Sequence, residues 1–257
     1  MAHFYFDSSA RSALGLIRSG NEDSAFISGR LIAVADGMGG HAGGEIASKI
    51  AIKTLYSLTP MLTDVSIDPD STEDLLLNSL HTIDFEIGAY AREAIELRGM
   101  GTTLTALLIH NDVVALLHVG DSRCYRLRGS VIEQLSNDHT VVQELLNQGA
   151  ITATEALEHP QRSVLTQALM GEGNVVPVLQ LYEAKEGDRY LLCSDGLSSV
   201  LTEKEIKVFL KKSNKADAIK ALIDATYIQG APDNVTLIIA DVTHNEVNVN
   251  ELLGAAL

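Results

Sequence analysis

The chain has 257 residues, enough for one large domain spanning 1–257. Hydrophobic residues make up 46% of it and charged residues 21%, the balance of a soluble protein that can bury a full core. The formal net charge is −15, which argues against nonspecific binding to nucleic acid or to an anionic membrane, because both need a positive protein surface.

The first predicted elements are two apolar runs, 24–27 and 31–35, joined by a short glycine-containing turn that indicates a hairpin. The second run is apolar throughout until Asp36, a pattern typical of a strand covered on both faces. A glycine-rich segment follows. Apolar residues then recur at helical spacing over 46–58, and we expect Pro60 to end this helix.

A second, longer helix is predicted where apolar residues alternate steps of four and three over 76–97, and Gly99 follows it. Several short strands come next, separated by turns too short to hold a crossover helix. Neighbouring strands with such connections must be antiparallel. These strands are 102–110, 113–119, 123–127 and 131–135.

The last third of the chain mixes helices and strands. The pattern predicts helices around 141–147, 202–211 and 216–228, and strands at 175–182, 189–194 and 234–242. Long helices between runs of antiparallel strands indicate one layered α+β domain of sheets covered by helices. The irregular stretch 159–173 is expected to be either a flap near the site or an ordinary connecting loop.

Four aspartates share one position, the end of a predicted buried strand: Asp36, Asp121, Asp195 and Asp233. A single aspartate there usually forms a turn or caps a helix. Three of the four stand beside a glycine, which lets backbone and ligand approach closely. Carboxylates gathered at one sheet edge would repel one another, and a divalent cation relieves that repulsion. Oxygen ligands favour Mg²⁺ or Mn²⁺, although the spacing alone does not bring the four together.

Six ordered segments resemble the motif series of the PPM/PP2C serine/threonine phosphatases, and the compact length and the DGMGG form resemble the bacterial branch. The resemblance spans nearly the whole chain. It implies hydrolysis of phosphoserine and phosphothreonine in proteins. It also implies a four-layer α-β-β-α sandwich, with two central antiparallel sheets flanked by helix pairs. The segments are RSGNED (18–23), VADGMGGHAGGE (34–45), GMGTT (99–103), HVGDSR (118–123), CSDGL (193–197) and APDNVT (231–236).

The resemblance assigns metal ligands position by position. Asp36 is expected to bridge two metal ions, with the carbonyl of Gly37 on the second ion. Asp195 and Asp233 would complete the protein ligands of the first ion. Asp121, together with Asp195, matches a third and weaker position. The expected ions are Mn²⁺ or Mg²⁺, two in the core and a third bound more loosely.

The same resemblance assigns the remaining site residues. Glu22 and Asp23 match residues that hold metal-bound waters, and Arg18 matches the arginine that binds phosphate. The implied reaction is in-line attack on phosphorus by a metal-bridged hydroxide. Many eukaryotic members carry a histidine where this chain has Met38, which cannot give a proton. We therefore expect metal-bound water to protonate the leaving alcohol, with His41 assisting.

Other kinds of site fit these residues less well. The segment 37–42 fits a dinucleotide fingerprint, but Asp36 would repel a pyrophosphate and the antiparallel strands disagree with that fold. A P-loop would need lysine where Glu45 stands. Neither cysteine has the arginine six residues later that a cysteine-dependent phosphatase requires. The alternative that survives is a catalytically silent phosphopeptide-binding or regulatory module on the same fold.

Two cysteines give no disulfide framework, no run approaches the roughly 18 apolar residues of a membrane helix, and the N-terminus does not resemble a signal peptide. We therefore expect a soluble, cytoplasmic protein, and as a separate expectation a monomer. The resemblance suggests phosphoproteins as partners, a serine/threonine kinase and its substrates among them. Any flexible tail is expected from about residue 244.

Overall fold

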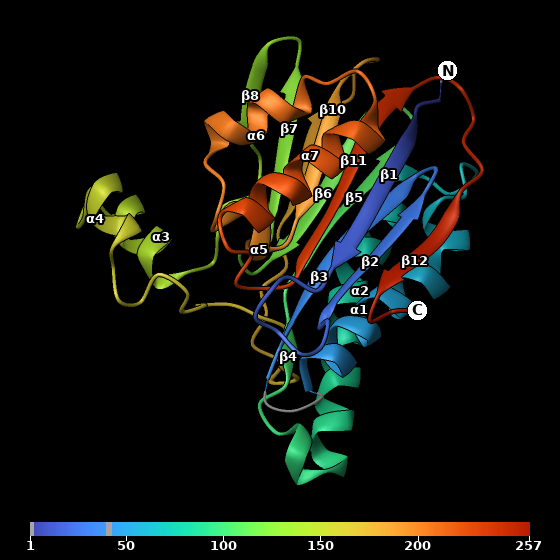
Figure 1. Cartoon of the computed structure of the whole chain (residues 1–257). Coiled ribbons are helices and arrows are strands. Elements are labelled where there is room, and N and C mark those ends of the chain that lie inside the picture. The colour runs from blue at the N-terminus through green and yellow to red at the C-terminus, as the bar shows by residue number, and fades with distance from the viewer. Residues whose placement is uncertain (1–2, 40–42) are drawn as a thin grey trace.

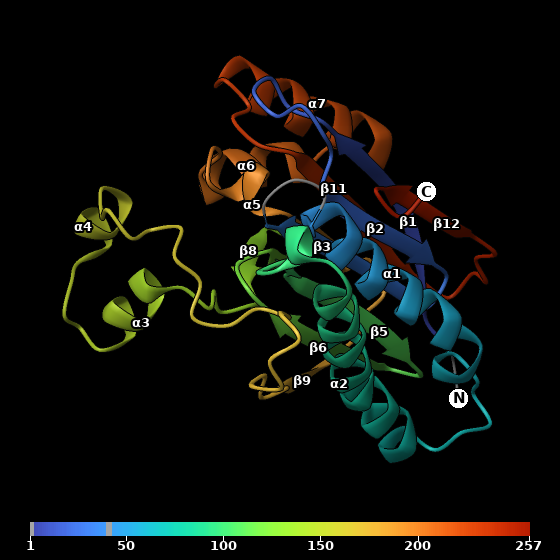
Figure 2. The same cartoon turned by 90° about the horizontal axis from the view of Figure 1, so that it is seen from below.

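Two antiparallel sheets pack face to face at the centre of the computed structural model, which describes residues 3–39 and 43–257. Helices cover the outer face of each sheet, so the chain forms four layers (Figure 1). The view from below shows α1 and α2 on one side and α6 and α7 on the other, with the sheets between them (Figure 2). The four-layer α-β-β-α architecture predicted from the resemblance is confirmed.

The first sheet has the strand order β1-β11-β10-β7-β8, and every neighbouring pair is antiparallel. Helices α5, α6 and α7 cover it. The bounds of these elements are β1 (Tyr5–Ala13), β7 (Arg123–Arg128), β8 (Val131–Gln134), β10 (Arg189–Cys193), β11 (Val235–Thr243), α5 (Asp195–Ser198), α6 (Glu203–Leu210) and α7 (Lys215–Ile228).

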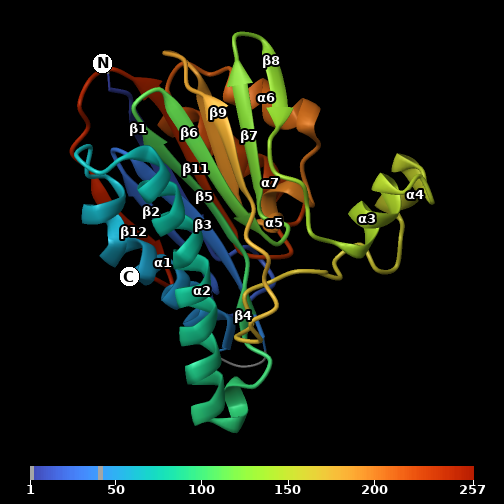
Figure 3. The ribbon, with the colours of Figure 1, turned by 180° about the vertical axis from the view of Figure 1, so that it is seen from behind.

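The second sheet has the order β12-β2-β3-β5-β6-β9, again antiparallel, and the short β4 pairs with β3. Helices α1 and α2 lie across it (Figure 3). The bounds are β2 (Asp23–Ser28), β3 (Leu31–Met38), β4 (Gly101–Thr102), β5 (Leu104–His110), β6 (Val113–Val119), β9 (Leu179–Glu183), β12 (Asn250–Gly254), α1 (Gly43–Leu62), α2 (Pro69–Glu93) and the 3-10 turn η1 (Ile95–Leu97).

The four layers enclose three apolar cores, and this explains why several strands are apolar at every position. In β3, Ile32 and Val34 point into the core between the sheets, whereas Leu31 and Ala33 pack under α1 and α2. Successive side chains of a strand alternate between its two faces, so a strand in a covered sheet needs apolar residues on both. The prediction that the run ending at Asp36 is covered on both faces is confirmed.

Two helices stand apart from the layers. Helices α3 (Val141–Asn147) and α4 (Ala153–Leu157) form a small lobe that projects to one side of the sandwich (Figures 1 and 2). The chain leaves and re-enters the body as a pair of segments, in which Val141 N–H donates to the Val164 carbonyl at 3.0 Å and Thr166 N–H donates to the His139 carbonyl at 2.8 Å.

Some element boundaries differ from the sequence prediction. Helix α1 continues past Pro60 and ends two residues later, at Leu62. The expected tail from about residue 244 also needs correction, because residues 250–254 pair with β2 as the edge strand β12. Ala256 just beyond is fully buried among residues of the α1–sheet core. Backbone pairing and one buried methyl group therefore hold the segment that was expected to be a flexible tail.

Candidate active site

A cavity of about 690 Å³ opens where strand ends of both sheets meet. The structure brings all four strand-end aspartates to it: Asp36 from β3, Asp121 from the turn after β6, Asp195 directly after β10 and Asp233 just before β11. Arg18, Glu22, Gly37 and Met38 line the same cavity. His41 lies outside the described residues.

Backbone contacts from the 99–103 motif fix the position of Asp36. Its N–H donates to the Thr103 hydroxyl at 3.0 Å. Its carbonyl accepts from the Thr103 N–H at 2.9 Å and from the Thr102 hydroxyl at 2.9 Å. These three bonds hold the Asp36 backbone without using its side chain, so the carboxylate can face the cavity.

Gly37 meets a different constraint. A Cβ atom at this position would collide with the carbonyl oxygens of Gly44 and Glu22. The Gly37 N–H also donates to the Glu22 carbonyl at 3.2 Å. Only glycine allows the start of α1 and the start of β2 to approach β3 this closely.

Asp23 lies beneath the cavity and is almost completely buried, at 1% exposure. It is paired with Asp36 across β2 and β3, and it accepts a hydrogen bond from the Ser194 hydroxyl at 2.8 Å. Burial, with smaller effects from Asp195 and Asp233, raises the pKa of Asp23 to about 7. The neighbouring Glu22 has a pKa raised by burial, and its N–H donates to the Asn234 side chain at 2.9 Å.

The other aspartates show the same electrostatic pattern. Burial raises the pKa of Asp36 well above its usual range, and the nearby carboxylates of Asp23 and Asp195 raise it further. Burial and then Asp195 raise the pKa of Asp121 to about 7. The pKa of Asp195 is raised by burial and then by Asp233. Several carboxylates therefore share one poorly solvated space, where either protons or cations must relieve their repulsion.

The donor set fits hard divalent cations. Among residues 3–39 and 43–257, no three His, Cys, Asp or Glu side chains form a set arranged to enclose an ion by themselves. Ions of the Mg²⁺ type keep several waters and take only one or two carboxylates each. Carboxylates such as those of Asp36 and Asp195, completed by water, would suit such ions, because the groups offered are all oxygens.

Arg18 supplies the positive charge at the cavity. Its guanidinium donates to the Asp233 carboxylate at 2.6 Å, and the Arg18 side chain is 51% exposed. A planar guanidinium can form two parallel hydrogen bonds to an oxyanion. Because the side chain is half exposed and held by one contact, it can turn toward an anion in the cavity.

The segment 163–175 forms the remaining wall of the cavity, with Ser163, Leu165, Gln167, Met170 and Glu172 among the lining residues. It overlaps the predicted flap 159–173, so the part of that stretch from 163 onward lies at the site. Sequence reasoning missed Asp84, which reaches the cavity from the buried face of α2. The available signal was a lone carboxylate inside the apolar stripe of a long helix.

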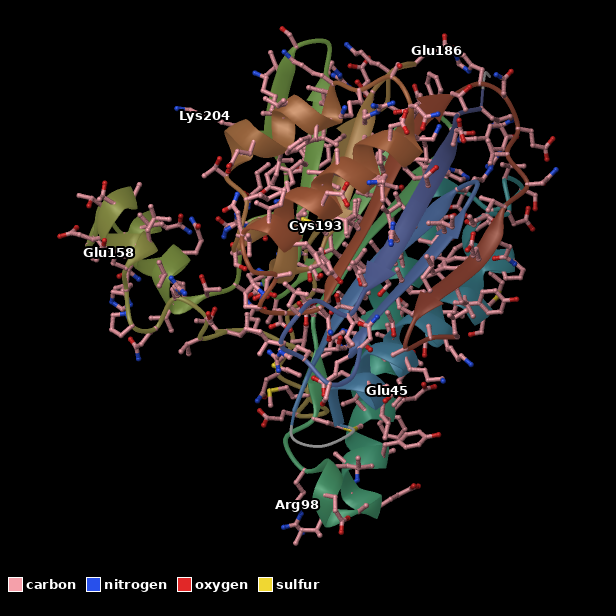
Figure 4. The ribbon with its side chains drawn as sticks, viewed as in Figure 1. Glu45, Arg98, Glu158, Glu186, Cys193 and Lys204 are labelled. Atoms are coloured by element: carbon pink, nitrogen blue, oxygen red, sulfur yellow. The ribbon has the colours of Figure 1, made fainter. Side chains whose placement is uncertain are left out.

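Cys193 lies inside the molecule, while Glu158, Lys204 and Glu186 extend from its periphery (Figure 4). Both cysteines are buried free thiols. None of the helices in the described part of the chain is long and apolar enough to span a membrane.

Known proteins resemble the chain over most of its length. The model of the protein phosphatase 2C family matches residues 21–224. The serine/threonine protein phosphatase PstP of Mycobacterium tuberculosis is 44% identical over 236 residues, which is 91% of this chain but only 44% of PstP. The serine/threonine phosphatase stp of Listeria monocytogenes is 35% identical over 240 residues, covering 90% of this chain and 94% of stp.

Solved structures of phosphatases have the same fold as this chain. The M. tuberculosis PstP/Ppp crystal structure superposes with a TM-score of 0.86 at 42% identity, covering 92% of this chain and 98% of that one. Stp1 of Staphylococcus aureus gives a TM-score of 0.85 at 34% identity, covering 92% of this chain and 94% of that one. The chain belongs to the protein phosphatase 2C family.

Proposed function

We propose that this chain is a metal-dependent phosphatase that removes phosphate from serine and threonine side chains of proteins. The observation that carries the proposal is the convergence of Asp36, Asp121, Asp195 and Asp233 with Arg18 around one cavity. The relatives from M. tuberculosis and L. monocytogenes are named serine/threonine phosphatases, which supports this substrate class.

Two cations are proposed to bind at this cavity. Asp36 would contact both, the Gly37 carbonyl one of them, and Asp195 and Asp233 the other, with Asp121 and Asp195 available to a third, weaker ion. A PstP catalytic-domain structure that is 40% identical contains two manganese ions, which supports Mn²⁺, and Mg²⁺ has the same ligand preferences. When bound, such ions acidify a shared water and neutralise charge on the phosphoryl group.

The side chains have distinct tasks in this proposal. Arg18 exchanges its contact with Asp233 for the phosphoryl oxygens and orients the ester for in-line attack. Glu22 and Asp23 orient water at the carboxylate cluster. Met38 lines the cavity but carries no proton, so the leaving alcohol is proposed to take its proton from water with help from His41. An unchanged pH-rate profile in His41→Ala would remove His41 from that role.

The cellular setting is also a proposal. We propose one phosphatase domain acting as a cytoplasmic monomer on phosphoproteins, a serine/threonine kinase and its substrates among them. The two buried free thiols are consistent with a reducing compartment. The phosphoprotein class follows from the names of the relatives.

Hydrolysis of phosphoserine, phosphothreonine and phosphotyrosine peptides, alongside an aryl phosphate, tests this function. We expect turnover of the aryl phosphate and of the first two peptides in Mn²⁺, and none after chelation. The competing silent module would instead bind phosphopeptide without metal and without releasing phosphate.

A further inference from the structure

Asp84 is a buried carboxylate on the inner face of α2, only 5% exposed. It accepts three backbone hydrogen bonds from one loop: Oδ1 from the N–H groups of Met170 (3.0 Å) and Gly171 (2.7 Å), and Oδ2 from that of Gly173 (2.8 Å). A buried carboxylate is costly unless it is fully hydrogen-bonded, and bonds to a charged acceptor are stronger than neutral ones. We call these four residues the Asp84 clamp.

Beside the clamp, the backbones of α2 and the loop are in direct contact. Gly88, one helical turn after Asp84, packs directly on Gly171: a Cβ on Gly88 would lie 2.7 Å from the Gly171 carbonyl oxygen. A Cβ on Gly171 would collide with the Gly88 backbone, and Gly171 has a φ of +76°, which favours glycine. Helix and loop therefore meet backbone to backbone at one fixed place.

The clamped loop forms part of the cavity wall. Met170 and Glu172 line the cavity together with Asp84 itself. The preceding residue, Leu169, pairs with Thr102 through two backbone hydrogen bonds of 3.0 and 2.9 Å. The Thr102 hydroxyl in turn donates to the Asp36 carbonyl at 2.9 Å. One continuous set of hydrogen bonds thus joins α2, the wall and the strand end that carries Asp36.

We propose that Asp84 is a positioning residue for the phosphatase reaction: it ties the 170–173 wall to α2 and so sets the distance between that wall and Asp36. The proposal rests on the proposed function. Asp36 is also held by the Thr103 N–H at 2.9 Å, independently of the clamp. Loss of the clamp therefore displaces the wall more than it displaces Asp36. In this proposal the wall is the part of the cavity that meets the peptide of a substrate.

Two routes break the clamp. Asp84→Ala removes all three acceptor bonds, while Asp84→Asn keeps the side-chain volume but presents only one acceptor oxygen. Gly88→Ala leaves the carboxylate in place and pushes the loop away with a methyl group. The matched control is Asp74→Ala, which changes an exposed aspartate on the same helix.

Steady-state kinetics on a phosphopeptide and on an aryl phosphate separate positioning from general damage. In Asp84→Ala and Gly88→Ala we expect KM for the phosphopeptide to rise about tenfold, because a wall displaced by about 1 Å no longer positions the peptide. The kcat for the aryl phosphate should stay within about threefold of wild type. Asp84→Asn should fall between these variants and wild type, and Asp74→Ala should match wild type. An unchanged KM for the phosphopeptide, or an equal loss of kcat/KM on both substrates, would overturn the proposal.

Amide hydrogen exchange provides a readout that needs no activity. The amides of Met170, Gly171 and Gly173 should exchange faster in Asp84→Ala and Asp84→Asn and at the wild-type rate in Asp74→Ala. Unchanged protection in the Asp84 variants would refute the clamp. If wild type hydrolysed neither substrate the proposed function would fall, whereas faster exchange at these amides would still establish the contact.

Discussion

Asp36 owes its position to neighbouring backbone and hydroxyl groups. Thr102 and Thr103 hold its carbonyl and its N–H, and Gly37 lets β2 and α1 approach behind it. The carboxylate is thereby fixed in a poorly solvated space beside Asp23 and Asp195. A site fixed in this way binds a cation without reorganising, which favours electrostatic stabilisation of charge that develops during reaction.

The shared burial of these carboxylates predicts a pH-dependent stability of the metal-free chain. Asp23 and Asp121 have pKa values raised to about 7, above the ordinary aspartate value that applies in the unfolded chain. Their contribution to stability is therefore complete below the unfolded pKa and is lost as pH rises through about 7. The Tm of chelator-treated protein should fall between about pH 5 and pH 8.

Added metal should counter the fall of Tm with rising pH. Mn²⁺ competes with protons for the same carboxylates, so it should raise the Tm more at about pH 8 than at about pH 5. Asp23→Asn keeps a group that can accept from Ser194 but cannot ionise, so this variant should show a shallower fall of Tm with pH. A metal-free Tm that is the same at both pH values would show that the carboxylates do not repel one another as described.

Arg18 is expected to act in binding rather than in stability. Arg18→Ala should lower kcat/KM for a phosphopeptide by about ten- to a hundredfold, the value of one charge-assisted contact to phosphate. Its exposed ion pair with Asp233 adds little to stability, so the Tm should hardly change. Arg98→Ala is the matched control, since Arg98 is exposed and extends away from the body (Figure 4). Equal kinetics for the two variants would remove Arg18 from the phosphate site.

The aspartates could be predicted from the sequence because each stands at one end of a recognisable buried strand. Their convergence could not, because Asp36 lies in one sheet, Asp195 and Asp233 flank strands of the other, and Asp121 lies in the turn that joins the two. Local spacing says nothing about how two sheets pack. The family resemblance supplied that step. Asp84 was missed because its partners are backbone N–H groups 86 to 89 residues away in the chain.

Strands with strong apolar patterns were predictable, whereas the edge strands β1 and β12 were not. Strands β5 and β6 are apolar and joined by a two-residue turn, so their antiparallel pairing follows from local sequence alone. Strand β1 alternates poorly and is rich in serine, and β12 is a five-residue edge strand. Both depend on a partner strand distant in sequence, β11 for β1 and β2 for β12, which propensity cannot reveal.

The covering helices should contribute stability through their apolar faces. Leu80 of α2 is fully buried in the core beneath α1 and α2, so Leu80→Ala should reduce the free energy of unfolding by about 2–5 kcal/mol. Val208 of α6 is 65% exposed, and Val208→Ala should change it by no more than about 0.5 kcal/mol. Urea unfolding followed by circular dichroism measures both. If Leu80→Ala lowered the free energy of unfolding no more than Val208→Ala, α2 would not pack as described.

Three apolar cores hold the two sheets and their helices in one arrangement, and that arrangement decides where the strand ends meet. The cavity therefore draws residues from distant parts of the sequence, from Arg18 to Asp233. PstP and Stp1 share this architecture, and the chain belongs to the same phosphatase family.

A metal titration of phosphopeptide hydrolysis tests the central claim most directly. Wild-type protein stripped of metal should release no phosphate from a phosphoserine peptide and should regain turnover as Mn²⁺ is added. Asp36→Asn, which preserves shape but weakens the proposed cation ligand, should stay at least about a hundredfold below wild type at every Mn²⁺ concentration. Full turnover in the presence of chelator, or a fully active Asp36→Asn, would contradict the account.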